Sequence, residues 1–316
     1  MININIRQLQ YIVAVSEQKS FEKAAEACFV TQSTLSTMVG RLEKELNIIL
    51  FDRKTKPIEI TKEGQEIIIQ ARTILQEMQN LEQIAGGLKG ELTGKLKIAV
   101  IPTVAPFLLP LFLKEFIEKY TGIHFVFSER VTEVIIEELA RRSIDIGILS
   151  TPINHPDLVA HPLYQEPFVL YDRSDDETPK EPFPISVSDI DVQKLWLLEE
   201  GHCLRTQIGK ICAMDQQGSL NWNLEYRSST IDTLKRFVTL NKGITLLPRL
   251  ATTDFTRNEK GYLRNFVEPV PAREISLVVH KHFAKRKILE KMQTSIARAV
   301  KPYFKKSLQT EIIAPE

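Results

Sequence analysis

Cysteine is scarce in this chain, with three among 316 residues, and so few in a chain this long do not indicate a disulfide scaffold. No uninterrupted apolar run reaches the roughly 18 residues that a transmembrane helix needs. The opening stretch MININIRQLQY has no basic segment followed by an apolar one, so we expect no secretory signal. These absences lead us to expect a cytoplasmic protein with reduced thiols and no membrane contact.

An excess of charge of either sign is also absent, because 41 basic side chains face 40 acidic ones. No global positive field therefore draws the chain to nucleic acid, and any DNA contact must come from a local surface. Walker loops, dinucleotide fingerprints and metal-ligand spacings are missing as well, so we expect no cofactor, no metal and no enzyme. With 43% hydrophobic residues, the length instead suits two or three domains with cores of their own.

The first ninety residues have helical periodicity. Helices are predicted over residues 7–17, after Ser20 as N-cap, and after Thr31 as N-cap. The last two are short and joined by about three residues, which is typical of a helix-turn-helix. Residues 50–61 contain a proline and an alternating apolar stretch, which predict a small hairpin, or wing, beside these helices.

A long helix is predicted from Thr61 to about Ala85, before a break at Gly86 and Gly87. Its apolar residues recur at heptad spacing, which favours a dimerising seam between two copies of the chain. The alternative is that the helix packs only on its own domain. The seam residues are Ile67, Ala71, Ile74, Met78 and Leu81.

From Gly94 onward the pattern alternates between strands and helices, which predicts an α/β region with a parallel sheet. Two such halves, crossed twice by the chain, would leave a cleft at the carboxyl ends of the strands. Strands are expected at 95–101, 124–129, 145–149, 168–171, 195–198, 224–226, 244–247 and 276–280, and helices at 106–120, 132–142 and 284–303.

Short polar side chains form the front of the helix that follows Thr31, where a recognition helix reaches base edges. A glutamine there can pair with adenine, and a basic wing can meet phosphates. A polar helix face is more often simply solvated, so this pattern alone does not establish DNA binding. The candidate DNA-contacting residues are Gln32, Ser33, Thr34, Ser36, Thr37 and Arg53.

The N-terminal sequence resembles that of LysR-type transcriptional regulators over its whole length. The matching residues are Phe21, Ala24, Ala25, Gln32, Ser33, Ser36, Leu42, Glu43, Leu46, Leu50, Phe51, Arg53, Thr61 and Gly64. The resemblance implies a winged helix-turn-helix domain at 1–61, a linker helix at 62–88 and a two-lobed, periplasmic-binding-protein-like regulatory domain at 94–304. Lobe I would take 94–166 with 271–304, and lobe II 167–270. It also implies double-stranded operator DNA, RNA polymerase and a homodimer or homotetramer as partners.

Cys203 and Cys212 are the residues that point most directly to chemistry. A nearby His202 and Arg205 would lower the pKa of the Cys203 thiol, and a helix starting there would add positive potential. A helix between the two cysteines would hold their Cα atoms roughly 13 Å apart, whereas a disulfide needs about 5.5 Å. Oxidation would then force local refolding. The alternative is that both are buried, inert hydrophobes.

The segment GHCLR resembles the peroxide-sensing members of the LysR family, as do IPTVAPFLLP from Ile101, the Glu129 to Thr132 motif and GITLLP from Gly243. The resemblance implies that hydrogen peroxide oxidises Cys203 to a sulfenic acid, which Cys212 captures as a disulfide. The residues that would bind or activate peroxide are Thr103, Thr132, His202, Arg205 and Arg273. Thr206 stands where such proteins often carry aspartate. A regulator that binds a metabolite in the cleft and a thiol peroxidase are the alternatives.

Overall fold

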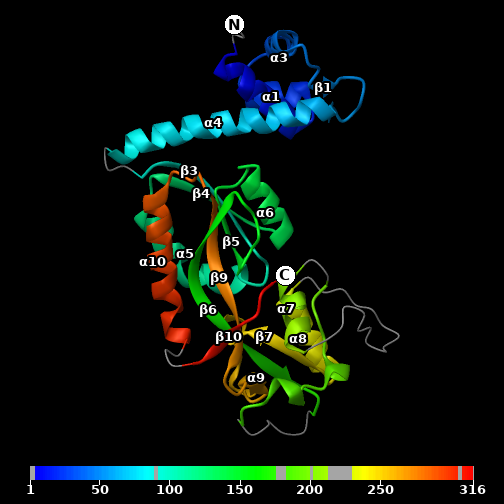
Figure 1. Ribbon diagram of the computed structural model, residues 1–316, viewed down its shortest axis with the longest axis vertical. Coiled ribbons are helices and arrows are strands. Elements are labelled where there is room, and N and C mark those ends of the chain that lie inside the picture. Colours follow the sequence, from blue (N-terminus) through cyan, green and yellow to red (C-terminus); the bar gives the residue numbers. More distant parts are fainter. Residues whose placement is uncertain are drawn as a thin grey trace. The chain divides into compact units, whose positions relative to one another are not determined.

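The computed structural model describes residues 4–88, 92–175, 183–199, 202–212, 230–304 and 308–315. They form two compact units, residues 1–91 with 141–143, and residues 92–140 with 144–316 (Figure 1). In the described part of the chain, no helix combines the length and the apolar character needed to span a bilayer.

The first unit is a winged helix-turn-helix. Three helices, α1 (Ile6–Gln18), α2 (Phe21–Ala27) and α3 (Gln32–Leu46), precede an antiparallel hairpin of β1 (Phe51–Asp52) and β2 (Glu59–Ile60). The predicted caps are confirmed: Ser20 accepts from Lys23 N, and Thr31 accepts from Thr34 N. One apolar core, built on Ile12, Leu35 and Phe51, holds these elements together.

Helix α4 (Lys62–Leu88) follows the wing, and the Thr61 hydroxyl accepts from Gly64 N at its start. The predicted break at Gly86 and Gly87 is wrong, since α4 runs through both glycines. A glycine inside a helix costs only about 1 kcal/mol relative to alanine, which the neighbouring turns of a 27-residue helix can offset.

The second unit is built on a mixed sheet with the order β4-β3-β5-β9-β6-β7, to which β8 and β10 are attached. The strands are β3 (Gly94–Val100), β4 (Ile123–Glu129), β5 (Ile146–Thr151), β6 (Leu158–Asp172), β7 (Ile244–Pro248), β8 (Leu263–Arg264), β9 (Val270–His280) and β10 (Thr310–Ile312). The helices are α5 (Ala105–Lys119), α6 (Thr132–Ala140), α7 (Cys203–Ile211), α8 (Ile231–Leu240), α9 (Arg257–Lys260) and α10 (Arg286–Val300), with short 3-10 turns at 187–189, 192–194, 249–252 and 301–303.

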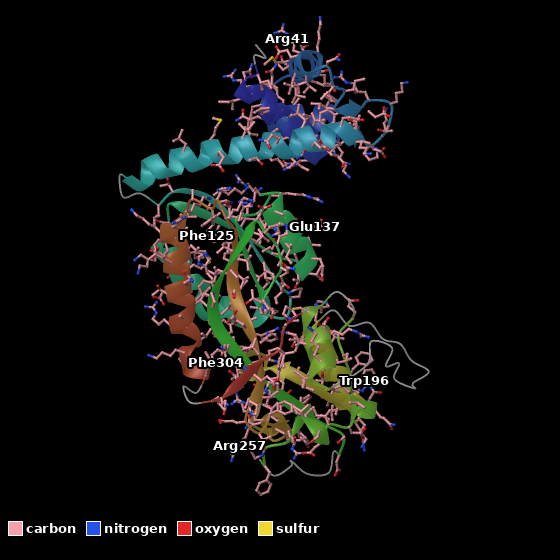
Figure 2. The ribbon with its side chains drawn as sticks, in the orientation of Figure 1. Arg41, Phe125, Glu137, Trp196, Arg257 and Phe304 are labelled. Atoms are coloured by element: carbon pink, nitrogen blue, oxygen red, sulfur yellow. The ribbon has the colours of Figure 1, made fainter. Side chains whose placement is uncertain are left out.

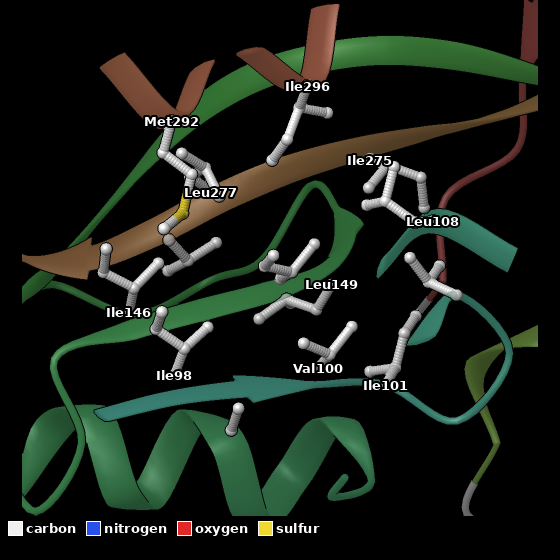
Figure 3. Close-up of a cluster of buried hydrophobic side chains, with 14 of the residues drawn as sticks. Ile98, Val100, Ile101, Leu108, Ile146, Leu149, Ile275, Leu277, Met292 and Ile296 are labelled. Atoms are coloured by element: carbon white, nitrogen blue, oxygen red, sulfur yellow. The ribbon is translucent and has the colours of Figure 1, made fainter. Parts of the chain in front are cut away.

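Two hydrophobic cores divide this unit into two lobes. In the first core, Met292 and Ile296 of α10 pack onto β9, next to the strands that carry Ile98 and Leu149 (Figure 3). The second core surrounds Leu246 and Leu204. It includes Trp196, which is labelled in Figure 2. The long strands β6 and β9 pair with each other and extend into both lobes, so they form the hinge between them.

The prediction of a parallel sheet is correct only for β3, β4 and β5. Strand β9 is antiparallel to β5, and β6 is antiparallel to both β9 and β7, because the chain turns back on itself at the hinge. The strand predicted at 195–198 is wrong: Leu195 makes only an isolated bridge to Ile244. The strand expected at 224–226 lies outside the described residues.

Candidate functional site

Cys203 is the first residue of α7, and its side chain is buried against the first core although α7 belongs to the second lobe. Cys212 is the C-cap of the same helix and packs against the second core. All three cysteines are free. The predicted helix between the two redox candidates is therefore present, with one cysteine at each end.

Burial raises the pKa of the Cys203 thiol, and Glu133 adds to this rise. Arg273, the Thr132 hydroxyl and the backbone N–H of Leu204 act in the opposite direction, in that order of importance. The balance leaves the pKa above its ordinary value, so the resting residue is a protonated thiol. The sequence-based expectation of a depressed pKa differs from this resting state because burial outweighs the positive charge.

Arg273 is fully buried and is held by two partners from different parts of the chain. Its Nε donates to Glu166 Oε2 at 2.9 Å, and its Nη1 donates to Thr103 Oγ1 at 2.9 Å. The other Glu166 oxygen accepts from the backbone N–H of Leu250. This pair fixes the guanidinium in the region where its charge acts on Cys203.

The Thr132 hydroxyl is buried and unsatisfied. Although it lies close enough to Cys203 to lower the thiol pKa, its Oγ1 makes no well-formed hydrogen bond within the described residues. A buried hydroxyl without a well-formed hydrogen bond costs free energy, so Thr132 Oγ1 is a candidate position for a ligand to bond. The structure thus brings together Thr103, Thr132, Arg273 and Cys203.

His202 and Arg205, the other two predicted activating residues, are placed differently. His202 is the N-cap of α7, and its buried ring has Nε2 3.7 Å from Glu199 Oε1. Arg205 turns back and donates to the Leu198 carbonyl at 2.9 Å. Neither His202 nor Arg205 is among the groups that shift the pKa of Cys203 in this structure.

Sequence reasoning missed three polar residues of this region. Glu166 holds Arg273, and Tyr164 has a buried hydroxyl without a partner in the described structure, whose pKa burial raises well above its ordinary value. Gln207 lies one helical turn after Cys203 and is fully buried. Only Gln207 had a usable signal, because four residues along a helix return to the same face.

The DNA-facing candidates lie on α3 and the wing. Gln32, Ser33, Thr34 and Thr37 are exposed, and Ser36 is half-buried. The hydroxyl of Thr31 contacts those of Ser33 and Thr34 at 3.0 and 2.8 Å, which orders the first turn. The exposed Arg41 of α3, labelled in Figure 2, is a basic residue that the sequence reasoning did not select.

Arg53 joins the wing to α3. Its Nη2 donates to Glu43 Oε2 at 2.8 Å, and its guanidinium lies 5.0 Å from the ring centre of Phe21. The side chain remains 45% exposed, so part of the guanidinium faces solvent. These contacts tie the wing to α2 and α3, and the exposed part of the guanidinium remains available to a phosphate.

The five seam candidates on α4 separate into two groups. Ala71 is buried in the core of the N-terminal unit, and Ile67 packs partly against it. Ile74 is 40% exposed and Leu81 is 68% exposed, and Met78 is half-buried. The second half of the heptad pattern is therefore the part that can face another chain.

Comparison with known proteins agrees with this architecture. A bacterial regulatory helix-turn-helix family model, lysR family, matches residues 6–65, and a LysR substrate binding domain model matches residues 89–299. The chain is 31% identical to a hydrogen peroxide-inducible genes activator of Haemophilus influenzae over 299 residues, 94% of this chain and 98% of that protein.

Two solved structures are also similar. A cysteine-to-aspartate variant of full-length OxyR from Pseudomonas aeruginosa gives a TM-score of 0.78 at 27% identity, covering 93% of this chain and 98% of that one. A cysteine-to-serine mutant of Corynebacterium glutamicum OxyR, bound to hydrogen peroxide, gives a TM-score of 0.61 at 26% identity. The match covers 95% of this chain and 94% of that one. The chain therefore belongs to the LysR family of helix-turn-helix DNA-binding regulators, and it resembles the hydrogen peroxide-inducible activators of that family.

Proposed function

We propose that this regulator senses hydrogen peroxide through Cys203 and Cys212 and controls transcription in response. The observation that carries the proposal is the buried Thr132 hydroxyl beside the Cys203 thiol, which makes no well-formed hydrogen bond within the described residues. Peroxide is small, uncharged and able to both donate and accept hydrogen bonds, so it suits a buried pocket with hydroxyl groups.

In the first step, the Cys203 thiolate attacks one peroxide oxygen. The sulfur–oxygen bond forms as the oxygen–oxygen bond breaks, giving a sulfenic acid and hydroxide, which the proton released from the thiol converts to water. Thr132 donates to or accepts from the bound peroxide. Thr103 accepts from Arg273, so its own hydroxyl proton can point to a peroxide oxygen. Arg273 stabilises the negative charge on both the thiolate and the departing oxygen.

In the second step, Cys212 attacks the sulfenic sulfur, and a disulfide and a second water form. The two cysteines are nine residues apart, which is about 180° of rotation and roughly 13 Å of rise along α7. Because a disulfide needs Cα atoms about 5.5 Å apart, α7 must unfold for the bond to form. A helix of nine residues is marginal without tertiary contacts, which makes this refolding feasible.

The test is mass spectrometry of the reduced full-length protein after one equivalent of peroxide. Wild type should form a Cys203–Cys212 disulfide, Cys203→Ser should form none, and Cys212→Ser should stop at the sulfenic acid, detected with a dimedone-type trap. Cys28→Ser, which removes the cysteine of the N-terminal unit, is the matched control and should behave like wild type. If wild type stays reduced, the cleft binds another effector, and turnover of excess peroxide with an added reductant would indicate a thiol peroxidase.

We also propose that the exposed half of the α4 pattern, Ile74, Met78 and Leu81, pairs two chains. The side chain of Leu81 is largely exposed in the single chain, so Leu81→Glu should leave the fold intact. A carboxylate buried in the seam is costly, so the variant should sediment as a smaller species at concentrations where wild type is a dimer or tetramer. Glu66→Gln, on an exposed position of the same helix, is the control. Identical sedimentation of Leu81→Glu and wild type would show that α4 does not hold the copies together.

A further inference from the structure

The match to the family model covers residues 89–299. Residues 308–315, here called the C-terminal segment, follow that region and contain strand β10. Their strand β10 pairs in parallel with Val270, Pro271 and Ala272 of β9. Strand β5 pairs with residues 274–278 of β9, so β10 continues the sheet where β5 stops. The segment therefore lies against the hinge (Figure 1).

The segment is fixed to the hinge by backbone and side-chain bonds. Val270 N donates to Gln309 O at 2.8 Å, and Ile313 N donates to Ala272 O at 2.8 Å. The Thr310 hydroxyl donates to Gln165 Oε1 at 2.8 Å. Leu308 and Ile313 pack against the second core, so apolar burial adds to these bonds.

Beyond the hinge, the segment contacts helix α7. The fully buried Gln207 donates through Nε2 to the Ile313 carbonyl at 2.7 Å and to Ser150 Oγ at 3.2 Å. Lys210 Nζ donates to the Ala314 carbonyl at 3.3 Å. Gln207 and Lys210 follow Cys203 by one and two helical turns, so these bonds hold the face of α7 that starts at the redox cysteine.

We propose that the C-terminal segment is a latch that keeps α7 folded in the reduced protein. The bonds to Ile313 and Ala314 require Gln207 and Lys210 to stay on a helix, and forming the Cys203–Cys212 bond requires that helix to open. The latch therefore opposes disulfide formation without touching the reacting thiol, and it sets how much oxidation is needed to change state. The consequence for signalling rests on the proposed function, but the holding of α7 does not.

The first experiment needs no oxidant. Hydrogen–deuterium exchange of the reduced full chain is compared between wild type, a chain that stops before Leu308, and Ile313→Pro, which removes the N–H that bonds Ala272. Truncation removes both bonds that α7 donates to the segment. Net loss of one to two hydrogen bonds corresponds to about 5- to 30-fold, so α7 amides should exchange about tenfold faster in the truncated chain. Ile313→Pro should show a smaller change in the same direction. Glu311→Ala, on an exposed side chain, is the control and should match wild type.

The second experiment follows oxidation by one equivalent of peroxide in rapid-quench samples. Truncation should leave the rate of sulfenic acid formation within about twofold of the wild-type rate. It should accelerate the following disulfide step about tenfold. Unchanged α7 exchange in both variants would overturn the latch. If the truncated chain fails to fold by circular dichroism, Ile313→Pro decides alone. If wild type forms no disulfide, the proposed function falls, while the exchange measurement still decides whether the latch exists.

Discussion

The candidate functional polar groups are exposed in the N-terminal unit of this molecule and buried in the regulatory unit. On α3, Gln32 and Thr37 are exposed and depend on the fold only for their position. In the regulatory unit, Thr132, Glu166 and Arg273 are buried. An exposed polar residue can be substituted with little loss of stability. Substituting a buried polar residue leaves its hydrogen-bond partners unsatisfied and lowers stability. Substitutions at the two sets of candidate residues should therefore differ in their cost to stability.

The largest effect should come from the buried ion pair. Arg273→Met leaves the buried Glu166 carboxylate with the Leu250 N–H as its remaining partner among the described residues, so the free energy of unfolding should fall by about 3–5 kcal/mol. Arg298→Met is the matched control, because it breaks an exposed pair with Glu115 and should cost within about 0.5 kcal/mol. Both are measured by urea unfolding followed by circular dichroism. Equal losses would remove the distinction between buried and exposed charge in this unit.

The next effect concerns the pH dependence of stability. Burial raises the pKa of Cys212 from 9.0 to about 11, so the folded chain keeps a proton that the unfolded chain releases above pH 9. Stability is therefore retained below pH 9 and lost as pH rises to 11, by about 2–3 kcal/mol from this group. The free energy of unfolding of Cys212→Ala, measured with urea, should fall correspondingly less between about pH 9 and 11. Cys28→Ala, at a more exposed thiol, should follow wild type closely, and a parallel loss in all three proteins would contradict the assignment.

A smaller effect separates reactivity from stability at the Cys203 site. Thr132→Val removes a hydroxyl that makes no well-formed hydrogen bond within the part of the chain that the structure describes, so the free energy of unfolding should stay the same or rise by up to about 1 kcal/mol. The second-order rate with peroxide should nevertheless fall about tenfold in stopped-flow measurements. Thr103→Val is the contrast, because it also removes an acceptor of Arg273 and should lower stability by about 1–2 kcal/mol. A rate unchanged by Thr132→Val would mean that its hydroxyl does not meet peroxide.

The smallest effect on stability should appear on the DNA-binding surface. Gln32→Ala should change the free energy of unfolding by less than about 0.5 kcal/mol. It should lower the discrimination between operator and scrambled DNA by about 1 kcal/mol or more if Gln32 reads a base edge. Fluorescence anisotropy with both DNAs, at two salt concentrations, measures this. A uniform loss of affinity for both would assign Gln32 to the phosphate backbone instead.

The sequence allowed good predictions wherever the signal was local. The caps at Ser20 and Thr31 follow from side chains that bond to nearby backbone N–H groups, and both are present. Strand β6 was found only from Phe168 onward, because Pro162 and Pro167 interrupt the pattern of its first half. These prolines are tolerated because β6 lies at the hinge, where its pairing with β9 is already irregular after Pro162.

The site was harder to predict than the fold. Thr103, Thr132 and Arg273 were selected through family resemblance, and no local pattern marks them. Glu166 was missed because its partner Arg273 lies 107 residues away, and only the folded sheet brings the two together. The balance of charge against burial at Cys203 is equally a property of the folded chain, so the sequence predicted the wrong direction for its resting pKa.

The partly buried position of Cys212 has a consequence for the order of steps in the proposed signalling. With a pKa of about 11, roughly one in ten thousand of these thiols is ionised at pH 7, so an oxidised Cys203 has almost no nucleophile to meet while α7 is intact. Opening the helix returns the thiol to water and raises the ionised fraction about a hundredfold. If Cys203 forms a sulfenic acid as proposed, the folded chain would hold that species until α7 opens. Opening of α7 during its lifetime would convert it to the disulfide, whereas earlier reduction would return the thiol.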